Sequence, residues 1–173
     1  MAGKRNALVS FGNRLVGEFS TDKWWSLRQK ALHQKGFLRY FYVFRYLKMV
    51  DRYHAFLPLE AEIASKPVFP HGISGIYLSC GARIGSGCTI LHQVTIGSNT
   101  FRDSKNAGSP VVGDDVFIGA GAKIIGNISV GNHVRIGANC VVTESVPDNC
   151  TVVPAKSRTI PKAEQMDNSY REW

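Results

Sequence analysis

"VGDDVFIGAGAKIIGNISVGNHVRIGANCVV", residues 112–142, places an aliphatic side chain at every sixth position. This spacing matches neither the 3.6-residue period of an α-helix nor the two-residue period of an isolated strand. A six-residue repeat is typical of a β-helix, in which three hexads complete a coil of about eighteen residues. Each hexad supplies one short strand and one turn. The repeated residues are Ile118, Ile124, Val130, Ile136 and Val142.

The repeat extends toward the N-terminus and is interrupted once. Leu78, Ile84, Ile90 and Ile96 keep the six-residue step, but Val112 follows Ile96 by sixteen residues. The extra segment is polar and contains glycine and proline, so we expect residues 98–110 to form a loop extruded from one corner. Insertions in solenoids often lie on the working face. The alternative is a tolerated surface insertion.

Positive charge is concentrated in the first part of the chain. The 173 residues carry a formal net charge of +8, and residues 1–70 hold 12 Lys and Arg against 5 Asp and Glu. Residues 24–57 interleave aromatic and basic side chains without a proline. They predict two helices that break near Gly36, the first capped by Ser20 or Thr21. We favour a helical cap on the first coil and on neighbouring subunits. Contact with an anionic membrane surface comes second, and nucleic-acid binding, for which no motif is present, comes last.

The remaining composition indicates an intracellular protein. No segment resembles a signal peptide or an apolar membrane span, which favours the cytoplasm, with the inner membrane face as a second option. The four cysteines form no CxxC pair, and Cys88 and Cys140 occupy inward positions of the repeat, where they suit a core. We expect an N-terminal helical region at residues 1–60, a β-helix at 61–160 and a tail at 161–173.

A further stretch, "PHGISGIYLSCGARIGSGCTILHQVTIG" at residues 70–97, adds a family likeness. With the hexads and the loop, it resembles the left-handed β-helix acyltransferases, in the branch of serine acetyltransferases and polysaccharide O-acetyltransferases. The resemblance covers residues 57–162, and "GFLRYFYVFRYL" at 36–47 resembles the capsule and exopolysaccharide members. It implies a mainly β fold, a left-handed parallel β-helix of hexapeptide repeats. It also implies a homotrimer, acetyl-CoA as donor and active sites between adjacent β-helices.

Two histidines are the catalytic candidates. His71 occupies the place of the family's catalytic base, before the "GIYL" strand. A hydroxyl needs a base to remove its proton as it attacks a thioester, and histidine titrates near neutral pH. His92 lies in "HQVTIG", where polysaccharide members often carry a histidine. It follows His71 by twenty-one residues, so we expect the two on adjacent coils near one corner. His133 is expected at the surface.

Three positions depart from the serine acetyltransferases. The resemblance places aspartates at positions 70 and 56 and a loop histidine at position 109, but this chain has Pro70, Phe56 and Ser109. Glu60 or Glu62 is a substitute candidate for orienting His71. These losses favour a sugar hydroxyl of a surface polysaccharide (capsule, exopolysaccharide or lipopolysaccharide) as acceptor.

Other functions remain open beside this one. The first alternative is a serine O-acetyltransferase of cysteine biosynthesis, and another is a non-enzymatic β-helix scaffold or binding module. No metal is expected, because a metal enzyme on this fold would need a third histidine beside His71 and His92.

The acetyl-CoA donor is expected along the later coils. The resemblance places its pantetheine arm beside the small residues Gly119, Ala120 and Ala138, with Lys123 adjacent, since a narrow groove admits only small side chains. The alternative is that these small residues serve only the geometry of the coil and do not contact the donor. The phosphates need cations, and Lys156 and Arg158 follow the last coil.

Overall fold

The computed structural model describes residues 19–163, 165 and 169 of the chain. It begins with two helices, α2 (Thr21–His33) and α3 (Gly36–Arg52). The predicted pair of helices is therefore present and breaks just before Gly36. The side chain of Ser20 accepts a hydrogen bond from the N–H of Lys23 and so caps α2. Residues 1–18 of the predicted helical region and part of the predicted tail lie outside the described residues.

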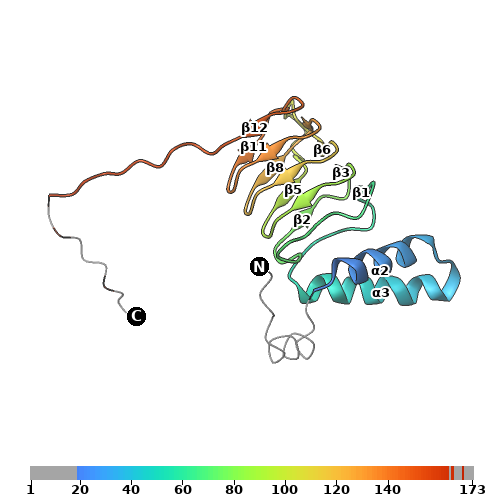
Figure 1. Cartoon of the computed structure of the whole chain (residues 1–173). Helices are drawn as coiled ribbons and strands as arrows, with labels where there is room; N and C mark the ends of the chain where they lie inside the picture. The colour runs from blue at the N-terminus through green and yellow to red at the C-terminus, as the bar shows by residue number, and fades with distance from the viewer. Residues whose placement is uncertain (1–18, 164, 166–168, 170–173) are drawn as a thin grey trace, which may run out of the picture.

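Within the described residues, short parallel strands form three four-stranded sheets, here called A, B and C. Successive strands pass from one sheet to the next, so three strands complete one coil and the coils stack into a triangular prism (Figure 1). This confirms the predicted left-handed parallel β-helix. Sheet A holds β2 (Tyr77–Leu78), β5 (Thr95–Gly97), β8 (Lys123–Ile125) and β11 (Val141–Val142); sheet B holds β1 (Glu62–Ile63), β3 (Arg83–Ile84), β6 (Val111–Val112) and β9 (Ser129–Val130); sheet C holds β4 (Thr89–Ile90), β7 (Phe117–Ile118), β10 (Arg135–Ile136) and β12 (Thr151–Val152).

The repeated aliphatic residues stack inside the prism. Ile96 pairs with Ile124 on sheet A, and Ile118 pairs with Ile136 on sheet C. All of the repeated aliphatics named above are buried, as are Cys88 and Cys140. Because equivalent residues of neighbouring coils lie in register, the hexad repeat of the sequence is also the repeat of the core.

A first coil precedes the hexads that begin at Leu78. Phe56 forms a parallel bridge with Tyr77, and Val68 forms another with Thr89. Their inward neighbours Leu57 and Phe69 are buried. The spacing from Val68 to Tyr77 is nine residues rather than six, and this three-residue excess conceals the first coil from a search for hexads.

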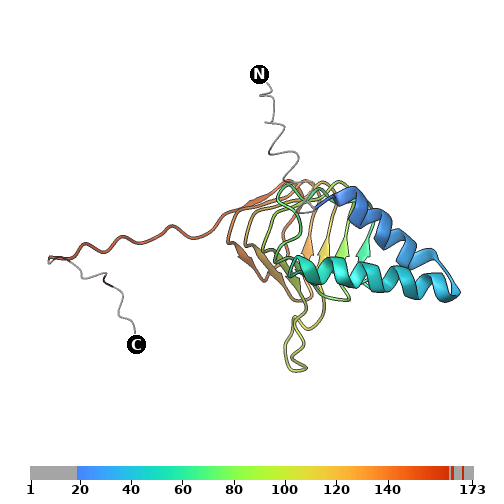
Figure 2. The same ribbon diagram turned by 90° about the horizontal axis from the view of Figure 1, so that it is seen from below.

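The helices pack on this first coil and project beyond it (Figures 1 and 2). Trp24 of α2 is fully buried, and its ring meets Phe69 edge-on at a centroid distance of 5.3 Å. The buried guanidinium of Arg28 donates hydrogen bonds to the backbone carbonyls of Leu59 and Ala61. Burial lowers the pKa of Arg28. The helices therefore cover the open end of the core, as expected of a cap on the first coil, whereas the expected packing on neighbouring subunits stays a prediction.

The predicted loop is present between β5 and β6. Asn99 and Gly108 exchange two backbone hydrogen bonds of 2.9 Å, which close its base. Figure 2 shows the loop standing out from the prism. Asn106 bonds to the backbone at Asn127 and Thr143, so the loop also contacts the following coils. No helix among the described residues has the length and apolar character needed to cross a bilayer.

Candidate active site

One edge of the prism gathers most of the predicted site residues. It consists of the turns that connect sheet C to sheet A, at residues 69–76, 91–94, 119–122 and 137–140, and is called the histidine edge below. Backbone hydrogen bonds join its turns: Gln93 N–H donates to Ser74 O, Gly121 N–H to His92 O and Asn139 N–H to Ala120 O. Residues that are far apart in sequence are therefore fixed in one row along the edge.

His71 lies in the three-residue excess of the first of these turns. Gly72 N–H donates to Phe69 O at 3.1 Å, closing a turn in which Pro70 takes the second place. Proline is suited to this place because its ring fixes φ. Gly72 has a φ of +72°, which favours glycine, and a Cβ there would lie 3.4 Å from Phe19. The insertion carries the His71 side chain into solvent at the edge.

His92 lies on the next coil and meets His71. The two Nδ1 atoms are 3.0 Å apart, and the ring centroids are separated by 5.1 Å. This confirms that the two histidines fall on adjacent coils at one corner. An N–H···N hydrogen bond needs one ring to carry the proton on Nδ1 and the other to accept it there. In a neutral pair the donor ring then has a bare Nε2, which is a base, and the acceptor ring has an Nε2–H, which is a donor.

No carboxylate of the described residues pairs with either histidine. Glu62 lies on sheet B and contacts Arg83 at 3.4 Å. Glu60 lies next to that sheet in the same groove. The hypothesis that Glu60 or Glu62 orients His71 is therefore wrong for this chain. Both glutamates lie at sheet B, whereas His71 lies at the edge between sheets C and A. The partner that His71 does have is His92.

The candidate donor residues continue the same edge. Gly119, Ala120 and Ala138 occupy the turns of the next two coils, and Lys123 begins the adjoining strand β8. Lys123 Nζ donates to the Gln93 carbonyl at 2.7 Å, which holds it beside the His92 turn. The Gly119 N–H is engaged with Ile136 O at 2.8 Å. The backbone N–H of Gly119 therefore serves coil stacking, and its predicted role beside the donor stays a prediction. The side chain of Ala138 is exposed.

Lys156 and Arg158 are not brought to the histidine edge. Both are exposed and lie in the extended segment that follows β12. Figure 1 shows this segment running away from the prism. Within one chain they make no contact with the other candidates, and their predicted role stays a prediction.

The loop also belongs to a different edge. It leaves sheet A for sheet B, whereas the histidines lie between sheets C and A. At its end, Ser109 Oγ lies 2.7 Å from Ser98 Oγ, so the position predicted to lack the family histidine closes the loop base instead. Sheet A separates the histidine edge from the loop edge.

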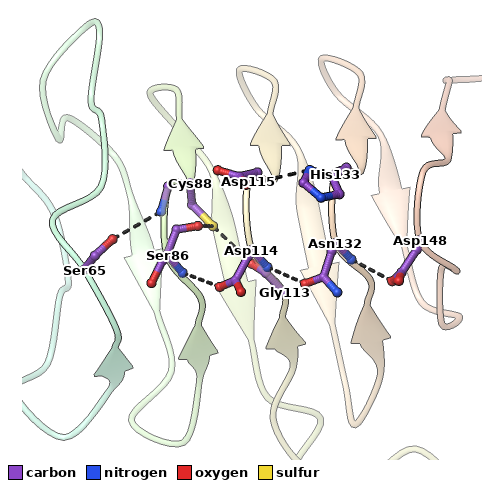
Figure 3. A network of polar contacts seen from close by, with 10 residues as sticks. Ser65, Ser86, Cys88, Gly113, Asp114, Asp115, Asn132, His133 and Asp148 are labelled. Atoms are coloured by element: carbon purple, nitrogen blue, oxygen red, sulfur yellow. Dashed lines mark hydrogen bonds and ion pairs between the residues drawn. The ribbon is translucent and has the colours of Figure 1, made fainter.

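The edge between sheets B and C carries polar side chains of a different kind (Figure 3). Side-chain oxygens of Asp114, Asn132 and Asp148 each accept a hydrogen bond from a backbone N–H on the preceding coil, at 2.6 to 2.8 Å. His133 is exposed, as predicted, and lies 3.7 Å from Asp115. These contacts satisfy turn N–H groups, so we assign this edge to coil stacking. The described residues contain no group of three side chains placed to hold a metal ion.

Comparison with known proteins agrees with the fold and the repeat. Residues 109–144 match the family model described as bacterial transferase hexapeptide (six repeats). The chain is 36% identical over 135 residues to a serine acetyltransferase of Helicobacter pylori, covering 76% of this chain and 75% of the relative.

Solved structures give the same result. Serine acetyltransferase isoform 3 of Entamoeba histolytica, in complex with cysteine, matches with a TM-score of 0.59 and 30% identity over 68% of this chain and 41% of that one. Serine acetyltransferase of Neisseria gonorrhoeae matches with a TM-score of 0.60 and 28% identity, over 83% and 53%. The chain thus spans about half or less of these two structures. The predicted acetyltransferase class is confirmed, whereas the expected closeness to polysaccharide O-acetyltransferases finds no support among these relatives.

Proposed function

Because the chain belongs to the serine acetyltransferase family, we propose that it transfers the acetyl group of acetyl-CoA to the hydroxyl of L-serine. The observation that supports this most directly is the contact of His71 with His92 on an edge whose later turns carry Gly119, Ala120 and Ala138. This acceptor replaces the sugar hydroxyl favoured by the sequence, since the relatives are named serine acetyltransferases.

His71 is the proposed general base. Its bare Nε2 removes the hydroxyl proton while the oxygen attacks the thioester carbonyl and forms a tetrahedral oxyanion. The oxyanion collapses, the carbon–sulfur bond breaks, and the CoA sulfur leaves with the proton that the histidine took up. His92 holds the Nδ1 side of His71 at 3.0 Å and is the proposed positioning residue. It takes the place that a carboxylate fills in many catalytic histidine pairs.

The donor is proposed to lie along the histidine edge toward the later coils. Ala120 and Ala138 leave room for the narrow pantetheine arm, and Lys123 stands beside it. Lys156 and Arg158 are proposed to bind the CoA phosphates, where arginine can bind two oxygens at once. Since their segment leads away from its own prism, the proposal places them against a neighbouring subunit of a homotrimer.

Trimer formation would also complete the acceptor side. The loop edge of one subunit would face the histidine edge of the next across the proposed cleft. The loop would then shield the reaction from water, a common role for loops beside active sites.

One observation favours a second acceptor, a sugar hydroxyl. Phe56 and Tyr77 lie side by side on sheet A and are each 49% exposed. Pro70, Phe56 and Ser109 offer no charge to the ammonium and carboxylate groups of free serine. Two exposed aromatic rings suit the apolar face of a sugar ring.

The test measures free thiol release from acetyl-CoA with L-serine and with a panel of monosaccharides and nucleotide sugars. Serine-dependent release that falls by about 10²–10⁴-fold in His71→Ala supports the proposal. His133→Ala, on the other polar edge, should keep full activity. Release with sugars alone would transfer the assignment to the second acceptor. No release with any acceptor, together with no binding of CoA by calorimetry, would reject the acetyl-transfer proposal.

A further inference from the structure

Helix α3 exposes an apolar stripe on the side opposite the one it buries. Its buried residues are Tyr46 and Val50. The side chains of Phe37, Tyr40, Phe44 and Leu47 are 83%, 76%, 59% and 56% exposed. Their spacing of three and four residues places them on one helix face, which we call the aromatic stripe. Neither the core nor the histidine edge uses these residues.

Basic side chains border the aromatic stripe. Lys48 Nζ lies 5.3 Å from the centre of the Phe44 ring, and Arg45 Cζ lies 5.6 Å from that of Phe41. On the surface of α3 these two cations lie beside the aromatic stripe. One flat surface can therefore contact the rings and the charges together.

The groove between α2 and α3 is basic as well. A hollow of about 550 Å³ is lined by Lys23, Arg45, Lys48 and Arg52, with Asp51 as its one acidic lining residue. Residues 21–52 hold eight Lys and Arg against two Asp, and only one of the eight, an arginine of α2, is buried. The whole hairpin therefore presents positive charge to its surroundings.

We infer that α3 docks this face onto a lipid surface that carries anionic headgroups. Aromatic rings are suited to the boundary between headgroups and acyl chains, and lysine and arginine attract anionic lipids. Pairing the stripe with the same stripe of a second copy would bring the bordering cations Arg45 and Lys48 of both copies together, which is unfavourable. Charge complementarity thus selects the lipid surface over a second copy.

The position of the hairpin permits this contact. The helices project beyond the first coil, away from the later coils of the prism (Figures 1 and 2). A flat surface can meet α3 without separating any pair of stacked coils. The inference concerns the helices alone and does not depend on the acceptor of the proposed acetyl transfer.

The experiment is flotation of the full chain with vesicles of phosphatidylcholine, with and without phosphatidylglycerol, at low and high salt. We expect binding only to the vesicles with phosphatidylglycerol, weakened by salt. Arg45→Gln with Lys48→Gln should weaken binding by about 25-fold, at about 1 kcal/mol per cation. Phe37→Ser with Phe44→Ser should weaken it by at least about tenfold.

Matched controls distinguish binding through this surface from nonspecific adsorption to the vesicles. Phe101 in the loop is 73% exposed, and Arg135 on β10 is also exposed. Phe101→Ser and Arg135→Gln should leave vesicle binding unchanged. Circular dichroism of each variant checks that it is folded.

Three results would overturn the inference. The first is no binding to phosphatidylglycerol vesicles at low salt, and the second is equal binding to phosphatidylcholine alone. The third is a change of assembly mass in the aromatic variant, measured by sedimentation velocity, with vesicle binding unaltered. That result would make the stripe a contact between subunits.

Discussion

Replacing Gly119 by alanine separates coil stacking from ligand binding at the histidine edge. A Cβ at Gly119 would lie 2.6 Å from Ala138 N, 2.8 Å from Gly137 C and 2.9 Å from Ile136 O. All three atoms belong to the backbone of the next coil, so no side chain can rotate away. Ordinary contacts begin near 3.5 Å, and the two coils must therefore separate by roughly an ångström.

The expected loss of stability follows from these contacts. Overpacking costs about 1–3 kcal/mol, and weakening the Gly119 N–H to Ile136 O bond adds about 1 kcal/mol. Lower entropy of the unfolded chain returns about 0.4–1 kcal/mol. We expect Gly119→Ala to lower the free energy of unfolding by about 2–3 kcal/mol, or the melting temperature by about 5–10 °C in a chain of this size.

The assay is urea and thermal unfolding at matched protein concentrations, followed by circular dichroism. Gly97→Ala is the control, since its Cβ would meet only side-chain atoms, the nearest being Ile125 Cδ1 at 3.0 Å. If Gly119→Ala were as stable as Gly97→Ala, the stacking argument would be refuted. Loss of CoA binding with full stability would instead return Gly119 to the donor site.

Two further predictions concern buried titratable groups. Burial raises the pKa of the Cys88 thiol, whereas Cys80 is exposed. A thiol reagent should therefore modify Cys80 fastest, the half-buried Cys150 more slowly and Cys88 only on unfolding, and Cys80→Ser should remove the fastest phase. Burial raises the pKa of Tyr46, whose hydroxyl donates to a backbone carbonyl at 2.6 Å, to about 12. Its neutral form stabilises the fold below about pH 10, and this contribution is lost as the pH rises toward about 12. Alkaline unfolding should be less steep in Tyr46→Phe but unchanged in Tyr40→Phe, and equal profiles would contradict the assignment.

The period of six in the sequence was sufficient to predict the β-helix. Hexads place residues such as Ile118 and Ile136 on one interior face, and no other regular structure has that period. The meeting of His71 and His92 was predictable for the same reason, because twenty-one residues is one coil plus the three-residue excess in the first turn.

Other features depend on contacts that no repeat records. Glu62 is only nine residues from His71 in the sequence, but it lies on sheet B, whereas His71 lies in the turn between sheets C and A. The hexads alone do not show this separation. The burial of Arg28 depends on two carbonyls, thirty-one and thirty-three residues away, that accept its hydrogen bonds. The close packing of Gly119 against the backbone of the next coil appears only when that coil is in place. A site formed by two subunits, such as the proposed one that includes Lys156, cannot be predicted from the repeat of one chain either.

The three-residue excess at residues 70–72 places the proposed base outside the regular hexads that build the core. Removing these residues would restore the six-residue step between Phe69 and Leu78 without touching a strand, yet the chain would lose His71. On such a scaffold a short in-frame insertion or deletion can add or remove a reactive group without altering the architecture. The corners of this prism can therefore carry chemistry that the strands and the core do not need for their own packing.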